Sequence, residues 1–322
     1  MKELKILAVV AFFTLITYYG VEPYAHHEMH KKVDANGNEI VYEHTGFTYP
    51  ELKMPAGIKG NAENGKALSA ACVGCHSIKS QKMPAPMDAL ASAGAYGVNP
   101  PDLSDAGAIY SENFLFDLMK NPAHALKVEH KFDPAKGKMH PMPPMAADDQ
   151  SAADLVAYFK SIAPKAEEIT PKQAFESACG RCHANRYGKW TQIGDVPKTK
   201  ANIVTHQNPD LMKFNTKVAE YQEKLAKYMG KLPPDLSIMI RARSEHFMEN
   251  FIEDPQSELP GTAMPRVGLN KEGYEKVIAY LEETGDPSKP KRQAIGPWVL
   301  GFFFIFTLLA YLWKKSQWKD LH

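Results

Sequence analysis

Two short stretches of the 322-residue sequence carry the residues best suited to chemistry. The first is Cys72-Val73-Gly74-Cys75-His76, and the second is Cys179-Gly180-Arg181-Cys182-His183. In a C-x-x-C-H sequence the two thiols can add to the two vinyl groups of one porphyrin, and the histidine that follows can bind its iron. All four cysteines of the chain lie in these two stretches. The sequence therefore predicts two covalently attached haem c groups, with His76 and His183 as iron ligands.

The cysteines could also serve three other purposes. A structural zinc site needs four nitrogen or sulfur ligands, which two C-x-x-C pairs could supply, but zinc does not require the histidine that directly follows each pair. A thioredoxin-like redox pair would have one C-x-x-C beside a βαβ pattern, which we do not find here. A disulfide framework is arithmetically possible, although a chain of this length can build a core without disulfides. Haem attachment explains the spacing and the histidines together.

Length and charge narrow the class of protein. A chain of 322 residues predicts two domains with room for membrane segments. The 38 Lys and Arg residues nearly balance the 37 Asp and Glu residues, so no basic field points to nucleic acid. The 14 methionines matter because methionine can bind haem iron opposite the histidine. Most methionines only fill cores, so each candidate ligand needs support from its position.

The N-terminal residues 1–20 are almost entirely apolar, with Lys2 and Lys5 near the start. This pattern fits either a signal peptide or a short membrane anchor. The only candidate cleavage site, Pro23-Tyr24-Ala25, is a poor match, so we favour an uncleaved anchor followed by a linker over residues 21–59. Either alternative exports the residues that follow.

Residues 295–313 form a second apolar run near the C-terminus. At ~1.5 Å per residue this run spans about 28 Å, enough to cross the hydrocarbon core of a bilayer. Trp298, Tyr311 and Trp313 lie near its ends, as aromatic residues do at membrane interfaces. Because c-type haem is attached on the exported side, we expect a bacterial inner-membrane protein with periplasmic haem domains and a cytoplasmic tail over residues 314–322.

Between the two ends, four landmarks occur twice in the same order. Each C-x-x-C-H motif is followed by Pro-Pro-Asp-Leu-Ser, then by a Ser-Glu helix start before a proline, and then by a Met-Pro pair before a tyrosine. The separations are equal in the two copies: Ser111 to Pro122 matches Ser244 to Pro255, and Met142 to Tyr158 matches Met264 to Tyr280. The sequence thus predicts two copies of one haem domain, at residues 60–164 and 170–285. Both copies are expected to be mainly α, because we find no convincing alternating strand pattern.

The repeated unit resembles the class I cytochrome c fold. The resemblance is carried by the C-x-x-C-H motifs and by two turns, Pro101-Asp102-Leu103 and Pro234-Asp235-Leu236. In that family the proline carbonyl of this turn accepts the N–H of the iron-binding histidine and so orients the ring. An alternative role is that the same residues cap the following helix, with Asp or Ser at the N-cap. The two roles can coexist.

The repeat also places the second axial ligands. Met264, in Thr262-Ala263-Met264-Pro265, is the candidate in the second copy. In the first copy, residues 138–145 offer three methionines and one histidine, and the shared interval from methionine to tyrosine selects Met142. Met145 is the reserve candidate, and His140 would give a bis-histidine iron of lower potential.

The second copy departs from a minimal domain through an insertion, residues 187–231, which holds an amphipathic helix over residues 209–229. The second copy and the C-terminal anchor resemble cytochrome c1, the haem subunit of the cytochrome bc complex. The resemblance is carried by the run from Leu232 to Ser237, by Arg241-Ala242-Arg243 after it, and by the later Ala263-Met264-Pro265. This resemblance covers about residues 170–322. With the added first domain, the whole chain resembles the dihaem variant of some bacterial bc complexes, in which two class I domains stand side by side as in cytochrome c4.

The resemblance implies an electron-transfer subunit of a quinol–cytochrome c reductase, with no catalytic residues of its own. Its partners would be a cytochrome b subunit, a Rieske iron–sulfur protein and a soluble periplasmic cytochrome c, within a dimeric complex in the membrane. Electrons would enter at the second domain and leave at the first.

Three other functions stay open. A dihaem cytochrome c peroxidase would need one iron with an open or displaceable site for peroxide, whereas each copy here has its own Met-Pro pair. A dihaem subunit of a cytochrome oxidase would also carry electrons, but such subunits usually lack a C-terminal anchor. A free, membrane-tethered cytochrome is the third alternative.

Overall fold

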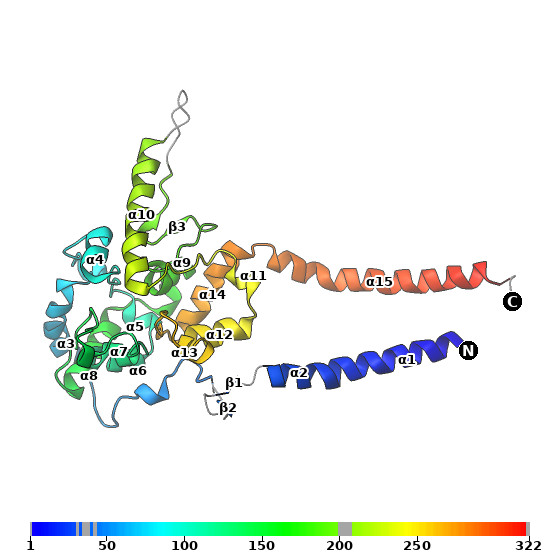
Figure 1. Ribbon diagram of the computed structural model, residues 1–322, viewed down its shortest axis with the longest axis horizontal. Helices are drawn as coiled ribbons and strands as arrows, with labels where there is room; N and C mark the ends of the chain where they lie inside the picture. Colours follow the sequence, from blue (N-terminus) through cyan, green and yellow to red (C-terminus); the bar gives the residue numbers. More distant parts are fainter. Residues whose placement is uncertain (1, 30–31, 34–38, 41–43, 199–207, 320–322) are drawn as a thin grey trace. The chain divides into compact units, whose positions relative to one another are not determined.

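The computed structural model describes residues 2–29, 32–33, 39–40, 44–198 and 208–319. The chain divides into two units, Met1–His44 and Thr45–His322. The described residues are mainly helical, as predicted (Figure 1). Strand structure in these residues is limited to isolated bridges and two small antiparallel pairs: β1 (Lys32–Val33) with β2 (Glu39–Ile40), and β3 (Trp190–Thr191) with β4 (Gly194–Asp195).

In the first unit, α1 (Lys2–Ile16) continues through a π-helical turn, Thr17–Val21, into α2 (Glu22–Met29). By length and composition, Glu3–Glu28 is long and apolar enough to cross a membrane. The helix therefore extends beyond the predicted end at residue 20 and takes in the start of the predicted linker. Pro23, which cannot donate a backbone hydrogen bond, is the second residue after the π-turn, where the helical hydrogen-bond pattern is already shifted.

The second unit begins with residues 45–52, which lie in the predicted linker but pack on the second repeat. Glu253, which is 1% exposed, accepts hydrogen bonds from the backbone N–H groups of Thr45 and Phe47. The Phe47 ring stacks on Tyr274 with a centroid distance of 4.5 Å. This segment is thus anchored to α12 (Glu245–Glu253) and α14 (Lys271–Gly285).

The first repeat contains six helices, which run in order along the chain. They are α3 (Ala62–Leu68), α4 (Ala89–Tyr96), α5 (Ala106–Ile109), α6 (Glu112–Lys120), α7 (Pro122–Ala125) and α8 (Asp149–Ile162). Polar side chains cap the N-termini of the first and last of these helices, α3 and α8. Asn61 accepts from the N–H groups of Glu63 and Asn64, and Asp148 forms a reciprocal capping box with Ser151.

The second repeat follows the same order, with the long helix α10 in the place of α4. Its helices are α9 (Pro171–Phe175), α10 (Pro209–Met229), α11 (Met239–Ala242), α12, α13 (Pro255–Glu258) and α14. Thr170 caps α9 in a box with Gln173, and Pro171 occupies the first helical position, where its missing N–H costs nothing. The bounds of α10 agree with the predicted amphipathic helix.

In both repeats the first helix packs against the last: α3 against α8, and α9 against α14. The second pair is joined by aromatic rings, with Phe175 and Tyr280 at 4.7 Å between centroids. The first pair crosses at Gly65, where an added Cβ would lie 1.9 Å from the carbonyl oxygen of Asp154. Only glycine permits so close an approach of the two backbones.

Replacing Gly65 with alanine is expected to lower the free energy of unfolding by about 1–3 kcal/mol, because the methyl group must push α3 away from α8. Gly94→Ala in α4 is the matched control, since its Cβ would find the nearest atom, Cε of Lys224, at 3.5 Å. Alanine also favours helix over glycine, so this control should be neutral or stabilising. Guanidinium unfolding of the haem-loaded protein measures both. Equal midpoints for the two variants would contradict the close crossing.

The two repeats share one continuous hydrophobic core. Backbone hydrogen bonds cross between them: the N–H of Ser111 donates to Gly268, and the N–H of Asn270 donates to Ile109, each at 2.9 Å. Phe114 packs over Gly268, where a Cβ would clash with its ring. These contacts hold the two copies together as one packed body.

The last helix, α15, spans Lys289–Gln317 and is long and apolar enough to cross a membrane. It is longer at both ends than the predicted apolar run over residues 295–313, because polar residues extend it. At its start, Arg292 donates two hydrogen bonds of 2.6 Å to the carboxylate of Asp286, and Lys289 pairs with Glu282. Pro297 lies within this helix.

Candidate haem-binding sites

The first attachment motif lies in a tight helical turn. After α3 the chain forms a 3-10 turn, Ser69–Gly74, which carries the first cysteine. The N–H groups of Cys75 and His76 both donate to the carbonyl oxygen of Cys72, at 3.1 and 2.9 Å. Neither cysteine forms a disulfide, Cys72 is buried, and Sγ of Cys75 donates to the hydroxyl of Tyr96 at 3.4 Å. The turn places the two thiols and the imidazole on consecutive parts of one short loop, as attachment to one porphyrin requires.

The second attachment motif has the same backbone turn. Helix α9 continues through a π-turn, Glu176–Gly180, into the motif. The N–H groups of Cys182 and His183 donate to the carbonyl oxygen of Cys179, at 3.1 and 2.9 Å. These distances equal those of the first motif. The two motifs therefore have the same local geometry, although a 3-10 turn leads into the first and a π-turn leads into the second.

Each motif histidine contacts the proline carbonyl of its own repeat. Nδ1 of His76 lies 2.8 Å from the carbonyl oxygen of Pro101, and Nδ1 of His183 lies 2.8 Å from that of Pro234. A carbonyl oxygen can only accept, so Nδ1 carries the proton in both rings. The other ring nitrogen, Nε2, keeps its lone pair and is the atom able to bind iron.

Backbone contacts hold the two proline turns against the motifs. The N–H of Leu103 donates to the carbonyl of Ser77, and that of Leu236 donates to Ala184, each at 2.9 Å. Ser77 and Ala184 are the residues that directly follow the two histidines.

The aspartates of the same turns cap local N–H groups. Asp102 accepts from Ser104, and Asp235 accepts from Ser237, each at 2.9 Å. The turn thus orients the histidine, as expected from the sequence. The expected helix cap does not form, because α5 begins after Asp105 and α11 after Ile238, and neither residue makes a side-chain cap hydrogen bond.

The electrostatics of the motifs fit neutral ligands. Burial lowers the pKa of both His76 and His183, which keeps the imidazoles uncharged. Burial raises the pKa of Cys72 to about 11 and that of Cys179 to about 12. A zinc site would need ionised thiolates, which burial disfavours, whereas a thioether carries no charge. Among the described residues, no three His, Cys, Asp or Glu side chains gather as a metal cluster.

The candidate methionines are all partly buried. Met142 and Met145 pack against the core, and the N–H of Met145 donates to the carbonyl of Met119 at 2.8 Å, which ties its backbone to α6. Nδ1 of His140 lies 3.1 Å from the carbonyl oxygen of Met142. In the second repeat the N–H of Met264 donates to the hydroxyl of Thr262 at 3.4 Å. Iron ligation by Met142, with Met145 in reserve, and by Met264 stays a prediction.

Helix α10 brings one residue to the site that the sequence analysis missed. Tyr221 is fully buried, and its hydroxyl donates to the carbonyl of Arg181 at 2.8 Å and accepts from the N–H of Asn99 at 3.0 Å. One hydroxyl thus joins the second attachment motif to the residue before Pro100-Pro101. The available signal was the apolar face of α10, on which Tyr221 and Leu225 recur at helical spacing.

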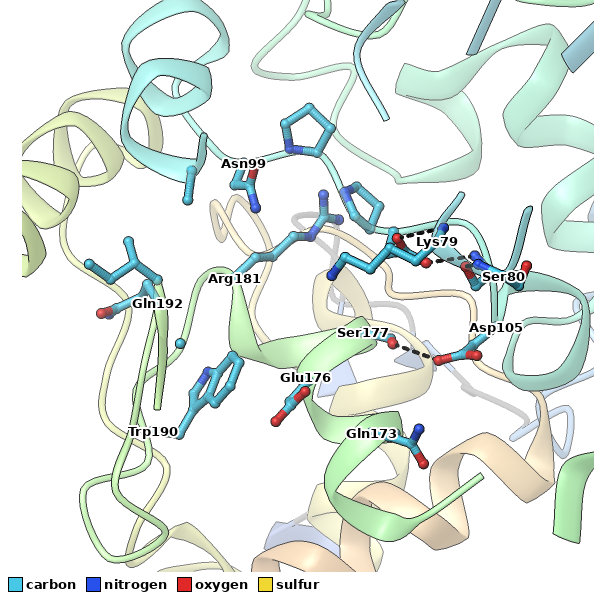
Figure 2. A pocket seen from close by; sticks show the side chains of 17 residues that line it. Lys79, Ser80, Asn99, Asp105, Gln173, Glu176, Ser177, Arg181, Trp190 and Gln192 are labelled. Carbon is cyan, nitrogen blue, oxygen red and sulfur yellow. Dashed lines mark hydrogen bonds between the residues drawn. The ribbon is translucent and has the colours of Figure 1, made fainter. Parts of the chain in front are cut away.

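A cavity of about 420 Å³ lies beside this link, between the two repeats. The first repeat contributes Lys79, Asn99 and the two prolines of its turn, and the second contributes Arg181 and Trp190 among others. Figure 2 shows the Arg181 side chain extending from the second repeat toward the first, between Asn99 and Lys79. The second motif therefore lies close to the histidine-orienting turn of the first.

Part of the chain matches a known protein family. Residues 62–163 match the family model of cytochrome c. These residues are a cytochrome c domain. Such a domain holds covalently bound haem c and transfers electrons, and its bounds contain the first attachment motif and the Pro101 turn.

Two curated relatives and one solved structure extend the comparison. The chain is 24% identical over 194 residues to the ammonia monooxygenase gamma subunit of Nitrosomonas europaea, covering 47% of this chain and 81% of that protein. It is 24% identical over 203 residues to cytochrome c1 of Allochromatium vinosum, covering 46% of this chain and 82% of that protein. A chain of the solved structure "Hyperthermophilic respiratory Complex III" is 27% identical, with 49% of this chain and 76% of that chain covered and a TM-score of 0.35.

Proposed function

We propose that this chain is a membrane-anchored dihaem c-type cytochrome that serves as the cytochrome c1-type subunit of a cytochrome bc complex. One observation carries the proposal. A C-x-x-C-H motif and a Pro-Pro-Asp-Leu-Ser turn occur twice, and in both copies Nδ1 of the motif histidine lies 2.8 Å from the proline carbonyl oxygen. The same pair of features in both copies supports one haem in each.

In this proposal each repeat holds its haem with four residues. They are Cys72, Cys75, His76 and Met142 in the first repeat, with Met145 in reserve, and Cys179, Cys182, His183 and Met264 in the second. Haem iron supplies a centre that alternates between the ferric and ferrous states. The chain attaches the group, orients the imidazole through Pro101 or Pro234, and surrounds it with a shared apolar core.

The proposed partners follow from the relative that is a cytochrome c1. An electron would arrive from a Rieske iron–sulfur protein beside a cytochrome b subunit, cross from the second repeat to the first, and leave to a soluble periplasmic cytochrome c. The helices Glu3–Glu28 and Lys289–Gln317 would anchor the chain in the inner membrane of a dimeric complex, with both haems on the periplasmic side.

The similarity to the gamma subunit of an ammonia monooxygenase favours a second candidate. In that case the same two haem sites would exchange electrons with a monooxygenase. The haem-binding residues would be unchanged, and only the partner would differ.

Purification of the full chain from its native membrane in mild detergent, followed by mass spectrometry, separates these functions. Near-equal amounts of a cytochrome b and a Rieske protein are expected. Monooxygenase subunits would favour the second candidate, and a haem–copper oxidase core would assign the chain to an oxidase. Recovery of the chain alone with two low-spin haems would overturn the bc assignment in favour of a tethered carrier, and a high-spin haem that reacts with peroxide would favour a peroxidase.

A further inference from the structure

The two attachment motifs differ in the residue that precedes the second cysteine. The first motif has Gly74 there, and the second has Arg181. Gly74 has no heavy atom within 4 Å of the place where its Cβ would be, so a Cβ would have room in the first motif as well. The cation is thus a feature of one copy alone.

The Arg181 side chain is only partly satisfied by the protein. Its Nε atom is buried and has no hydrogen-bond partner among the described residues. The carboxylates that line the same cavity are engaged elsewhere: Asp102 accepts from Ser77 and from the N–H of Ser104, Asp105 accepts from Ser177, and Glu176 pairs with Lys172. Lys79 is the other cation of the cavity lining.

The position of Arg181 directs its charge to the first haem site. The side chain lines the cavity together with Pro101, whose carbonyl oxygen is 2.8 Å from Nδ1 of His76 (Figure 2). The charge of Arg181 therefore lies beside the turn that orients His76.

Tyr221 holds the backbone that carries this cation. Its hydroxyl donates to the Arg181 carbonyl at 2.8 Å and accepts from the Asn99 N–H at 3.0 Å. Because Tyr221 is 0% exposed, water does not compete for either hydrogen bond. One buried side chain therefore ties the second motif to the first proline turn.

We propose that Arg181, from the second attachment motif, raises the midpoint potential of the first haem relative to the second and so directs electrons from the second repeat to the first. The inference rests on the proposed presence of two haems. Reduction removes one positive charge from an iron centre, and a fixed cation nearby in a medium of low dielectric favours the reduced state. One electron moves, one iron is oxidised as the other is reduced, and no bond is made or broken.

Spectroelectrochemical titration of the full chain carrying Arg181→Gln tests this proposal. The equilibrium constant for electron transfer from the second to the first haem should fall about tenfold, which is about 59 mV in the difference between the two potentials. Arg181→Lys should restore most of the difference, because it keeps the charge. A Met264→His background, which moves the second haem's potential, identifies which wave belongs to which haem.

Arg186→Gln is the matched control. It removes the same charge shortly after the same motif, from a side chain that is 83% exposed and pairs with Asp235 of the second repeat. Solvent screens such a charge, so the first haem's potential should not change.

Haem content, measured on the same samples as the pyridine haemochrome, separates the possible failures. With two haems present, equal shifts of both waves or no shift in Arg181→Gln would overturn the role of Arg181. Fewer than two haems in the unaltered chain would instead overturn the proposed function. If Arg181→Gln loses haem, Arg181→Met, which keeps the aliphatic part of the side chain, gives the same comparison.

Discussion

Replacing Cys179 and Cys182 together with alanine is expected to halve the covalent haem content, from two groups per chain to one. The first motif should load normally, because its turn is formed by its own hydrogen bonds, from Cys75 and His76 to Cys72. The second motif would keep His183 and its contact with Pro234 but would have no thiol left to attach a porphyrin. Pyridine haemochrome assay after extraction of loosely bound haem, normalised to protein mass, measures the change.

The reciprocal variant, Cys72→Ala with Cys75→Ala, provides the matched control. It should also leave one covalent haem, and the fourfold variant should leave none. A chain that keeps its full haem content in either double variant would contradict attachment at that motif. Loss of both haems in one double variant would instead show that the repeats load in a fixed order, and such a result would contradict independent turns.

Loss of the second haem is also expected to destabilise the whole second unit. The two repeats share one core, in which Phe175 at the second motif is fully buried. A ligand that binds only the folded state stabilises it, so removing one should lower the unfolding midpoint of both repeats together. Separate transitions for the two repeats would argue against a shared core.

The elements that could be predicted from sequence are those with local signals. Helix α10 begins after Asn208, whose side chain accepts from the N–H of Leu211, and has Pro209 at its first position. It ends at Gly230, which has the left-handed backbone that stops helices. These residues determine both ends without help from the rest of the chain, so the predicted bounds of 209–229 are confirmed. The turns with Pro101 and Pro234 were accessible for a similar reason, because each was recognised from a short repeated motif.

The elements that could not be predicted depend on contacts between distant residues. The segment 45–52 lies in the predicted linker, because its partners, such as Glu253, are far away in the sequence and give no local signal. The role of Tyr221 was hidden for the same reason, since Asn99 and Arg181 come from two different repeats. A pattern of spacing identifies a buried helix face, but it does not identify what that face covers. The position of the Arg181 side chain, which extends toward the first repeat, could not be predicted for the same reason.

Replacing Met264 with alanine is expected to convert the second haem from a low-spin to a high-spin state and to lower its potential. Methionine opposite histidine raises the potential of haem iron, and axial ligands together span a range of about 0.8 V. Met264 lies on a loop outside the helices, where its N–H donates to the hydroxyl of Thr262. Loss of the thioether should therefore open the iron without disturbing the helices. Electron paramagnetic resonance reports the spin state, and redox titration reports the potential.

The first repeat allows a sharper form of the same test, because two methionines compete. Met142→Ala should change the spin state of the first haem, and Met145→Ala should not, although some loss of stability is expected because the Met145 side chain packs against the core. Met212→Ala, on an α10 side chain that is 58% exposed, controls for the loss of any methionine. If Met145→Ala opens the iron and Met142→Ala does not, the methionine-to-tyrosine interval shared by the repeats does not mark the ligand. The first iron would then be bound further along its loop than the second.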